Sequence, residues 1–312
     1  MNKNITITIT AAVFILAIII VFALQSGRTR NTNVSNKDGT TASTQSGGFF
    51  STTAAKAAEA RASQIVALKD GDTFDMTASI VKKEINGKEV KMLAYNGMIP
   101  GPLMKVPQGA TITVNFTNNT DVETTIHSHG VRLANKFDGV PDVTQKPIGI
   151  GEKFTYRLTF PDVGLYWYHP HIREDYAQEL GLYGNFLVTP SEDSYWSPVN
   201  REVPLILDDI LIGPDGIEPF HKQLSNRTLM GRYGNVMLVN GETSYALQAQ
   251  PGEVVRFYIT NAANARPFNL AIPGATMKLV GGDNGRYEQE RIVESALLNP
   301  SERAIVEVFF EK

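Results

Sequence analysis

The chain has 312 residues, of which 42% are hydrophobic and 20% are charged, and this composition suits about two globular domains. It contains no cysteine, which excludes disulfides, thiolate zinc sites, iron–sulfur ligation, a cysteine nucleophile and any blue-copper site built by this chain alone. From residue 55 onward 25 basic side chains stand against 31 acidic ones, and no basic stripe is evident. We therefore expect no nucleic-acid partner.

An uncharged run of 20 residues, 5–24, is long enough to cross a bilayer as a helix. We assign residues 1–25 to a signal anchor or signal peptide, and the poor small-residue pattern of "FALQS" favours an uncleaved anchor. The remainder is therefore expected to be exported, either membrane-anchored on the extracytoplasmic side or secreted.

The segment that follows is a candidate tether. Residues 26–53 are mostly Ser, Thr, Asn and Gly with few apolar positions, which is typical of a flexible linker. The Ala-rich stretch "AAKAAEARASQ" at 54–64 predicts a short helix. Residues 26–64 are thus predicted to be a linker that ends in a helix.

Beyond residue 64 the pattern is that of β-strands. "TITVNFTNN" at 111–119 and "KFTYRLTF" at 153–160 alternate apolar and polar residues, as half-buried strands do. Short strands interrupted by Pro and Gly clusters indicate an all-β protein built of β-sandwiches.

An internal repeat divides this β region in two. Asn96-Gly97 precedes Pro107, and Asn240-Gly241 precedes Pro251, with an offset of 11 residues from the Asn in both copies. A similar strand follows each proline, "PQGATITVNFTN" in the first copy and "PGEVVRFYITN" in the second. We predict two tandem sandwiches, at 65–190 and 200–312.

Four of the five histidines occur as two His-x-His pairs, and both pairs lie in the first copy. In an extended strand, residues i and i+2 point to the same face, so each pair presents two imidazoles side by side. A single pair would more often be solvated than metal-bound, but two pairs in one sandwich can converge. The expected metal is copper, with zinc left open, and the candidate ligands are His127, His129, His169 and His171.

The second copy lacks such a pair. Its corresponding stretch, "RPFNLAIPG" at 266–274, contains no histidine. The fifth histidine, His221, has no partner at ligand spacing and is interpreted as a surface residue. Only the first sandwich is therefore expected to bind metal.

These motifs together resemble the first cupredoxin domain of the laccase-like multicopper oxidases: "HSHG", "DGVPDVTQKPI", "GLYWYHPH" and "ELGLYGNFLVTP". The closing "LLNPSERAIVEVFFE" resembles the family's second domain, so the resemblance covers nearly everything after the tether. It implies two cupredoxin-like Greek-key sandwiches. It also implies that His127 binds a type 2 copper and that His129, His169 and His171 bind the paired type 3 coppers.

The resemblance also implies a catalytic role for Asp138, which matches an acidic residue that assists proton delivery during reduction of O2. An alternative is that Asp138 only caps the Asp-Gly turn in "FDGVP". Arg173, Glu174 and Asp175 are candidates to orient the imidazoles by hydrogen bonds. The aromatic run 166–168 is interpreted as packing.

The family's type 1 copper and four further cluster histidines belong to a third domain, which has no counterpart in this sequence. One hypothesis is that the residues form part of an oxidase that couples oxidation of a phenol, metal ion or similar small donor to reduction of O2, with the third domain either on the same, longer chain or on a separate subunit. A second is a complete, non-catalytic, membrane-tethered copper-binding module. A third, weaker hypothesis treats the sandwiches as adhesion modules. For this chain alone, we expect at most weak copper binding and no oxidase turnover.

Overall fold

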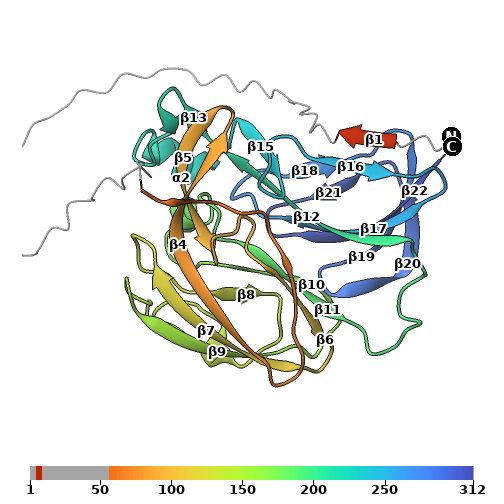
Figure 1. The fold of residues 1–312 in the computed structure, drawn as a ribbon, viewed down its shortest axis with the longest axis horizontal. Helices are drawn as coiled ribbons and strands as arrows, with labels where there is room; N and C mark the ends of the chain where they lie inside the picture. The colour runs from red at the N-terminus through yellow and green to blue at the C-terminus, as the bar shows by residue number, and fades with distance from the viewer. Residues whose placement is uncertain (1–4, 9–55, 312) are drawn as a thin grey trace, which may run out of the picture. The chain divides into compact units, whose positions relative to one another are not determined.

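The computed structural model describes residues 5–8 and 56–311, and strands dominate these residues, as expected for an all-β protein. The strand ladders of residues 58–189, orange to green in Figure 1, do not mix with those that begin at residue 201, teal to blue. Each set pairs internally, so each forms its own sheets.

The first set forms two sheets whose side chains meet in a common core. The strands 111–119 and 153–160 predicted from alternation are confirmed as β7 and β9, with the apolar side chains of Phe116 and Tyr156 buried. One sheet has the order β2-β4-β7-β9 with β5 beside β4, and the other has the order β3-β6-β11-β10-β8. The bounds are β2 Ala58–Glu59, β3 Ile65–Ala67, β4 Thr73–Ile85, β5 Lys88–Tyr95, β6 Leu103–Pro107, β7 Thr111–Asn119, β8 His127–His129, β9 Lys153–Thr159, β10 Gly164–His169 and β11 Gly184–Thr189. Two short helical turns accompany them, η1 Asn135–Phe137 and α1 Glu174–Ala177.

The second set is built around a six-stranded sheet of order β15-β12-β17-β22-β19-β20. Short ladders β18-β21, β13-β14 and β1-β16 and the helix α2 complete it. The bounds are β1 Ile5–Thr8, β12 Arg201–Ile210, β13 Ile212–Gly213, β14 Gly216–Ile217, α2 Leu224–Met230, β15 Val236–Val239, β16 Ala246–Ala249, β17 Val254–Asn261, β18 Phe268–Leu270, β19 Ala275–Gly282, β20 Gly285–Val293, β21 Ala296–Leu298 and β22 Arg303–Phe310.

The internal repeat has a physical basis in two equivalent asparagines. Asn96 and Asn240 both adopt a φ of 51°, a left-handed conformation that Asn tolerates better than most residues. The Asn96 side chain accepts a hydrogen bond from Thr77 N at 2.7 Å, and Asn240 accepts one from Ile206 N at 2.8 Å. In both copies the Asn-Gly turn is therefore fastened to an earlier strand in the same way.

One strand, β10, is buried along its whole length. A strand buried on both faces contacts two layers. Here Leu165 packs in a cluster with Tyr258 and Ile305 of the second set of strands. The face of β10 that carries Leu165 is thus covered by the second sandwich.

The predicted short helix at 54–64 is wrong over the described residues. Ala58–Glu59 form β2, which runs parallel to β4, and Arg61 bridges to Met98. Strand pairing supplies backbone hydrogen bonds, such as Ala60 N to Lys82 O at 2.8 Å, and these outweigh the small helix preference of alanine.

The predicted N-terminal helix and the tether fall almost entirely outside the described residues. Within the predicted helix, Ile5–Thr8 are described as β1, antiparallel to β16. No helix in the part of the chain that the structure describes is both long and apolar enough to cross a membrane.

Candidate metal centre

The two His-x-His pairs lie on neighbouring antiparallel strands. The register of β8 and β10 places His169 opposite His127, and Trp167 opposite His129. Residues that face each other across a ladder point to the same side of the sheet, as do residues i and i+2. His127, His129 and His169 therefore share one face, and His171 follows directly beyond Pro170.

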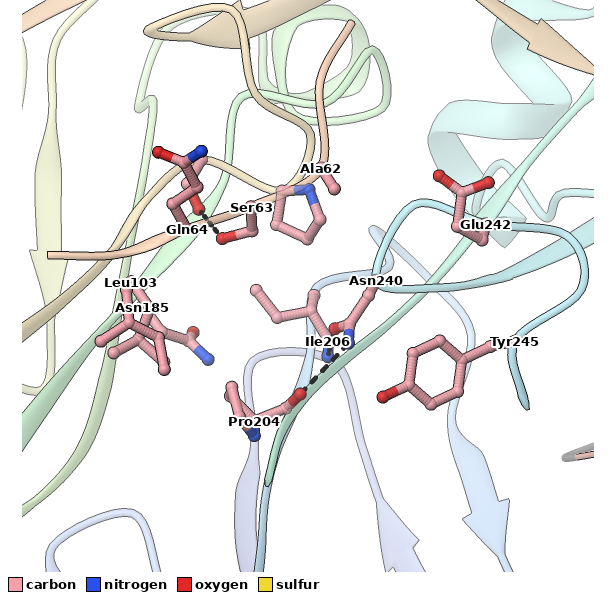
Figure 2. Close-up of a pocket in the computed structure, with 13 residues that line it drawn as sticks. Ala62, Ser63, Gln64, Leu103, Asn185, Pro204, Ile206, Asn240, Glu242 and Tyr245 are labelled. Atoms are coloured by element: carbon pink, nitrogen blue, oxygen red, sulfur yellow. Dashed lines mark hydrogen bonds between the residues drawn. The ribbon is translucent and has the colours of Figure 1, made fainter. Parts of the chain in front are cut away.

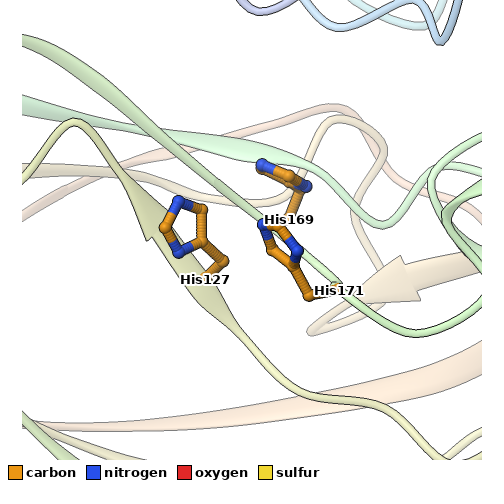
Figure 3. A group of neighbouring side chains, drawn as sticks. All are labelled: His127, His169 and His171. Atoms are coloured by element: carbon orange, nitrogen blue, oxygen red, sulfur yellow. The ribbon is translucent and has the colours of Figure 1, made fainter. Parts of the chain in front are cut away.

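The imidazoles converge. Each of His127, His169 and His171 offers a nitrogen, and these three nitrogens lie within 4.8 Å of one another (Figure 3). The ring centroids of His127 and His171 are 4.5 Å apart. His129 Nδ1 lies 3.4 Å from His169 Nε2, so the fourth histidine adjoins the same group. The structure brings all four predicted ligands together.

Burial lowers the pKa of His127, His129 and His169 and so favours their neutral forms. It lowers the pKa of His169 well below the usual value for histidine, and the neighbouring histidines lower it further. Burial also lowers the pKa of His129 to about 4, with the nearby Arg303 guanidinium contributing, and lowers the pKa of His127. A neutral imidazole has a free lone pair, which metal binding requires.

Three of the rings are held through their Nδ1 atoms. His127 Nδ1 lies 2.7 Å from Asp138 O, and His169 Nδ1 lies 3.0 Å from Pro170 O. His171 Nδ1 lies 3.1 Å from the Glu174 carboxylate. Because an oxygen acceptor at Nδ1 favours the tautomer with hydrogen there, the Nε2 lone pair is left for a metal. A set of all-imidazole donors fits copper or zinc.

Of the three residues predicted to orient the imidazoles, Glu174 has that contact in the structure. Arg173 and Asp175 instead pair with each other at 2.7 Å, on the exposed side of α1. Glu174 lies three residues beyond His171, in the first turn of α1, and this spacing brings its carboxylate back to the imidazole.

Asp138 adjoins His127 as predicted. Besides its backbone oxygen, its carboxylate Oδ1 lies 3.3 Å from His127 Nδ1. The next residue, Gly139, has a φ of 79°, and a Cβ there would overlap the carbonyl of Ile126. The Asp-Gly turn is therefore pressed against the start of β8, which fixes the position of Asp138 relative to His127.

Trp167, predicted only to pack in the core, also contacts one of the predicted ligands. The aromatic run is indeed buried, but the Trp167 ring also stacks on His169, with centroids 4.0 Å apart and planes at 18°. The i, i+2 spacing places Trp167 and His169 on the same face of the strand, but the stacking of their rings depends on how the side chains pack.

The second sandwich has no counterpart to this cluster at the equivalent place. Phe268 and Leu270 of β18 are buried in its hydrophobic core. His221 is exposed, as expected.

Comparisons with known proteins agree with this geometry. Two sequence models described as multicopper oxidase match residues 77–193 and 204–311. Multicopper oxidase MmcO of Mycobacterium tuberculosis is 31% identical over 243 residues, which cover 68% of this chain and 46% of that protein. Multicopper oxidase mco of Staphylococcus epidermidis is 28% identical, over 70% of this chain and 49% of that protein. The chain thus spans about half the length of the curated relatives that it matches.

Solved structures show the same fold. A multicopper oxidase from Pseudomonas thermotolerans superposes with a TM-score of 0.68 at 28% identity, covering 79% of this chain and 59% of that one. A metallo-oxidase from Campylobacter jejuni gives a TM-score of 0.67 at 27% identity, covering 85% and 58%. The cupredoxin-like fold expected from the sequence motifs is confirmed.

Proposed function

Because the chain belongs to the multicopper oxidase family, we propose that His127, His129, His169 and His171 supply half of the histidine ligands of a copper cluster that reduces O2 to water. The observation that carries this proposal is the convergence of three imidazole nitrogens within 4.8 Å. Copper bound there supplies the redox chemistry, and the residues of this chain hold, orient and desolvate it.

The protein residues around the cluster have separate tasks. Trp167 and the oxygen atoms at each Nδ1 fix the ring orientations, so the nitrogens are arranged before metal binds. The Asp138 carboxylate, half-buried beside His127, is placed to hold a proton near the cluster. Reduction of O2 to water consumes four protons, and a carboxylate at this point is suited to pass them on.

The division of the ligands between coppers remains a prediction. The family resemblance gives His127 to the type 2 copper and the other three histidines to the type 3 pair. Among the described residues, the group whose nitrogens lie within 4.8 Å of one another joins His127 to His169 and His171, which belong to different coppers in that division.

The oxidase activity requires ligands and an electron entry site from outside these 312 residues. A phenol, a metal ion or a similar small one-electron donor would supply electrons through a cysteine-ligated copper on a further domain or a separate subunit. We further propose that the cluster works on the extracytoplasmic side, because the uncharged run 5–24 has the length and apolarity of a signal anchor or signal peptide.

Copper titration of the 312-residue chain tests the ligand assignment. We expect His127→Ala and His169→Ala each to weaken Cu(II) binding at least tenfold, measured by competition with a chelator and by electron paramagnetic resonance. The control is His221→Ala, because His221 is exposed and outside the group. Equal affinity in all variants would refute the assignment.

The coding DNA beyond the Lys312 codon tests the oxidase part of the proposal. An open frame that encodes a His-Cys-His element, or a neighbouring gene that encodes one, supports the oxidase. If neither is present, the alternative of a copper-binding module without turnover replaces it.

A further inference from the structure

A small cavity lies on the same sheet face as the histidines, and its wall begins at β11, next to the strand of His169 and two strands from that of His127 and His129. The ladder places Trp167 opposite His129 on one side and opposite Asn185 on the other. Leu103 and Ile65 face each other on the next two strands, and both line the cavity together with Asn185. With strands spaced about 4.8 Å apart, Asn185 is about 10 Å from His129.

The cavity has a volume of about 210 Å³ and lies between the two sandwiches. Its wall is mainly apolar, and Figure 2 shows Leu103, Pro204 and Ile206 around the central space. Typical drug-sized pockets span roughly 300–1,000 Å³, so this cavity suits a molecule with a single ring.

One hydrogen-bond donor at this cavity is unsatisfied. Asn185 is 1% exposed, and among the described residues its Nδ2 has no hydrogen-bond partner, while its Oδ1 accepts a hydrogen bond from Thr260 at 3.1 Å. In Figure 2 the Asn185 side chain lies at the edge of the central space. Two other polar side chains of the wall do make hydrogen bonds: Ser63 donates to Gly101 O, and Asn240 donates to Pro204 O. A buried donor without an acceptor costs about 1–3 kcal/mol.

The rim of the cavity indicates what kind of molecule fits. Ile65 is 61% exposed there, an apolar surface that a bound ring would cover. Glu242 is the charged residue of the lining, and Lys83 neutralises it at 2.8 Å. The cavity therefore offers no net charge to bind an ion.

We propose that this cavity is a binding site for a small, neutral, single-ring aromatic compound with a carbonyl oxygen. The oxygen accepts the hydrogen bond from Asn185 Nδ2, and the ring packs against Leu103 and Ile206 and beneath Ile65. The site is distinct from the histidine cluster and does not depend on copper.

A pair of isosteric probes tests the site in the unmodified 312-residue chain. Acetophenone carries the carbonyl, whereas α-methylstyrene has a CH2 group in its place. In titrations followed by proton–nitrogen correlation spectra, we expect acetophenone to bind about three- to tenfold more tightly and to shift the Asn185 side-chain amide signal. Equal affinities, or shifts that leave the Asn185 amide unchanged, would overturn the proposal.

Two variants separate the donor from the surrounding packing. Asn185→Leu removes the donor and should abolish the preference for acetophenone. Thr260→Val is its matched control, because it deletes the same Asn185–Thr260 hydrogen bond but leaves the Nδ2 donor in place. A preference that survives in Asn185→Leu, or disappears in Thr260→Val, contradicts the proposal. If Asn185→Leu does not fold, the two probes on the unmodified chain decide.

Discussion

Asp138 contacts His127 through its backbone oxygen and through its carboxylate, and a substitution can remove the second contact while keeping the first. Asp138→Ala retains the backbone oxygen 2.7 Å from His127 Nδ1 but removes the carboxylate. We therefore expect copper loading to stay largely intact, while O2 reduction by the assembled enzyme slows about 100-fold or more. Copper content and oxygen consumption, measured on the same preparation, check the two parts separately.

A neighbouring carboxylate provides the control for this prediction. Asp142 lies in the same loop but is exposed, so Asp142→Asn should leave both copper content and turnover unchanged. Unchanged turnover in Asp138→Ala would refute the proton-delivery role and leave Asp138 only as part of the turn.

Glu174 orients His171 from the first turn of α1. Glu174→Ala removes the acceptor 3.1 Å from His171 Nδ1, and loss of such a partner typically lowers metal affinity 10- to 100-fold. Competitive copper titration measures the change. Asp175→Asn is the control, because Asp175 pairs with Arg173 rather than with a histidine; a loss of equal size in that variant would contradict the assignment.

At the scale of the element, the strand β8 is held in place by the turn that follows it. Gly139→Ala would force a Cβ into the carbonyl of Ile126 at a φ of 79°. Gly151 has a similar φ of 80°, but a Cβ added there would meet no atom within 4 Å. Gly151→Ala therefore measures the backbone strain alone, about 1–2 kcal/mol.

The comparison of these two variants forms a prediction. We expect Gly139→Ala to lower the free energy of unfolding clearly more than Gly151→Ala, and to weaken copper binding as His127 shifts. Urea denaturation and copper titration measure the two effects. Equal destabilisation would mean that the turn moves away without disturbing β8.

The elements that sequence predicts well are those whose burial alternates. β7 and β9 each have one face in the core, so period-two patterns located them within a residue. β10 is buried on both faces, and its pattern alone does not tell which face carries the site. The Ala-rich stretch failed because pairing of β2 with β4, a contact far away in sequence, decided its conformation.

The grouping of the four histidines could be predicted from the sequence, but the detailed geometry of their rings could not. The spacing of the histidines predicted that their imidazoles converge, since residues i and i+2 share a strand face. The stacking of Trp167 on His169 depends on side-chain packing, and the approach of Arg303 to His129 depends on how the second sandwich packs against the first. Neither contact follows from the His-x-His spacing.

At the scale of the whole molecule, the two sandwiches meet through buried charges as well as apolar side chains. Glu179, which follows α1 in the first sandwich, is 2% exposed and pairs with Arg232 of the second at 3.0 Å. Arg266 pairs with the buried Asp209 of β12 at 2.6 Å, beside this pair. Removing either partner of such a pair leaves a buried charge uncompensated.

Glu179 makes the stability of the molecule depend on pH. Burial raises the pKa of this carboxyl from 4.5 to about 7; Asp209 also raises it, and the Arg232 guanidinium opposes the shift. Between pH 4.5 and about pH 7, the carboxyl of Glu179 is protonated more in the folded state than in the unfolded state. The free energy of unfolding therefore falls as pH rises through this range. This one group lowers stability by about 3 kcal/mol between pH 4.5 and 7, and by little more above that range.

Replacement of Glu179 by glutamine tests this dependence. Glutamine retains an oxygen that can accept from Arg232 and from Leu211 N but does not titrate. We expect the stability of the unmodified chain, relative to Glu179→Gln, to fall between pH 5 and pH 8, as measured by urea denaturation at both values. Glu192→Gln, at an exposed position, should leave the pH dependence unchanged. If Glu179→Gln and the unmodified chain change in parallel with pH, Glu179 is already ionised at pH 5 in the folded state, and its pairing with Arg232 outweighs its burial.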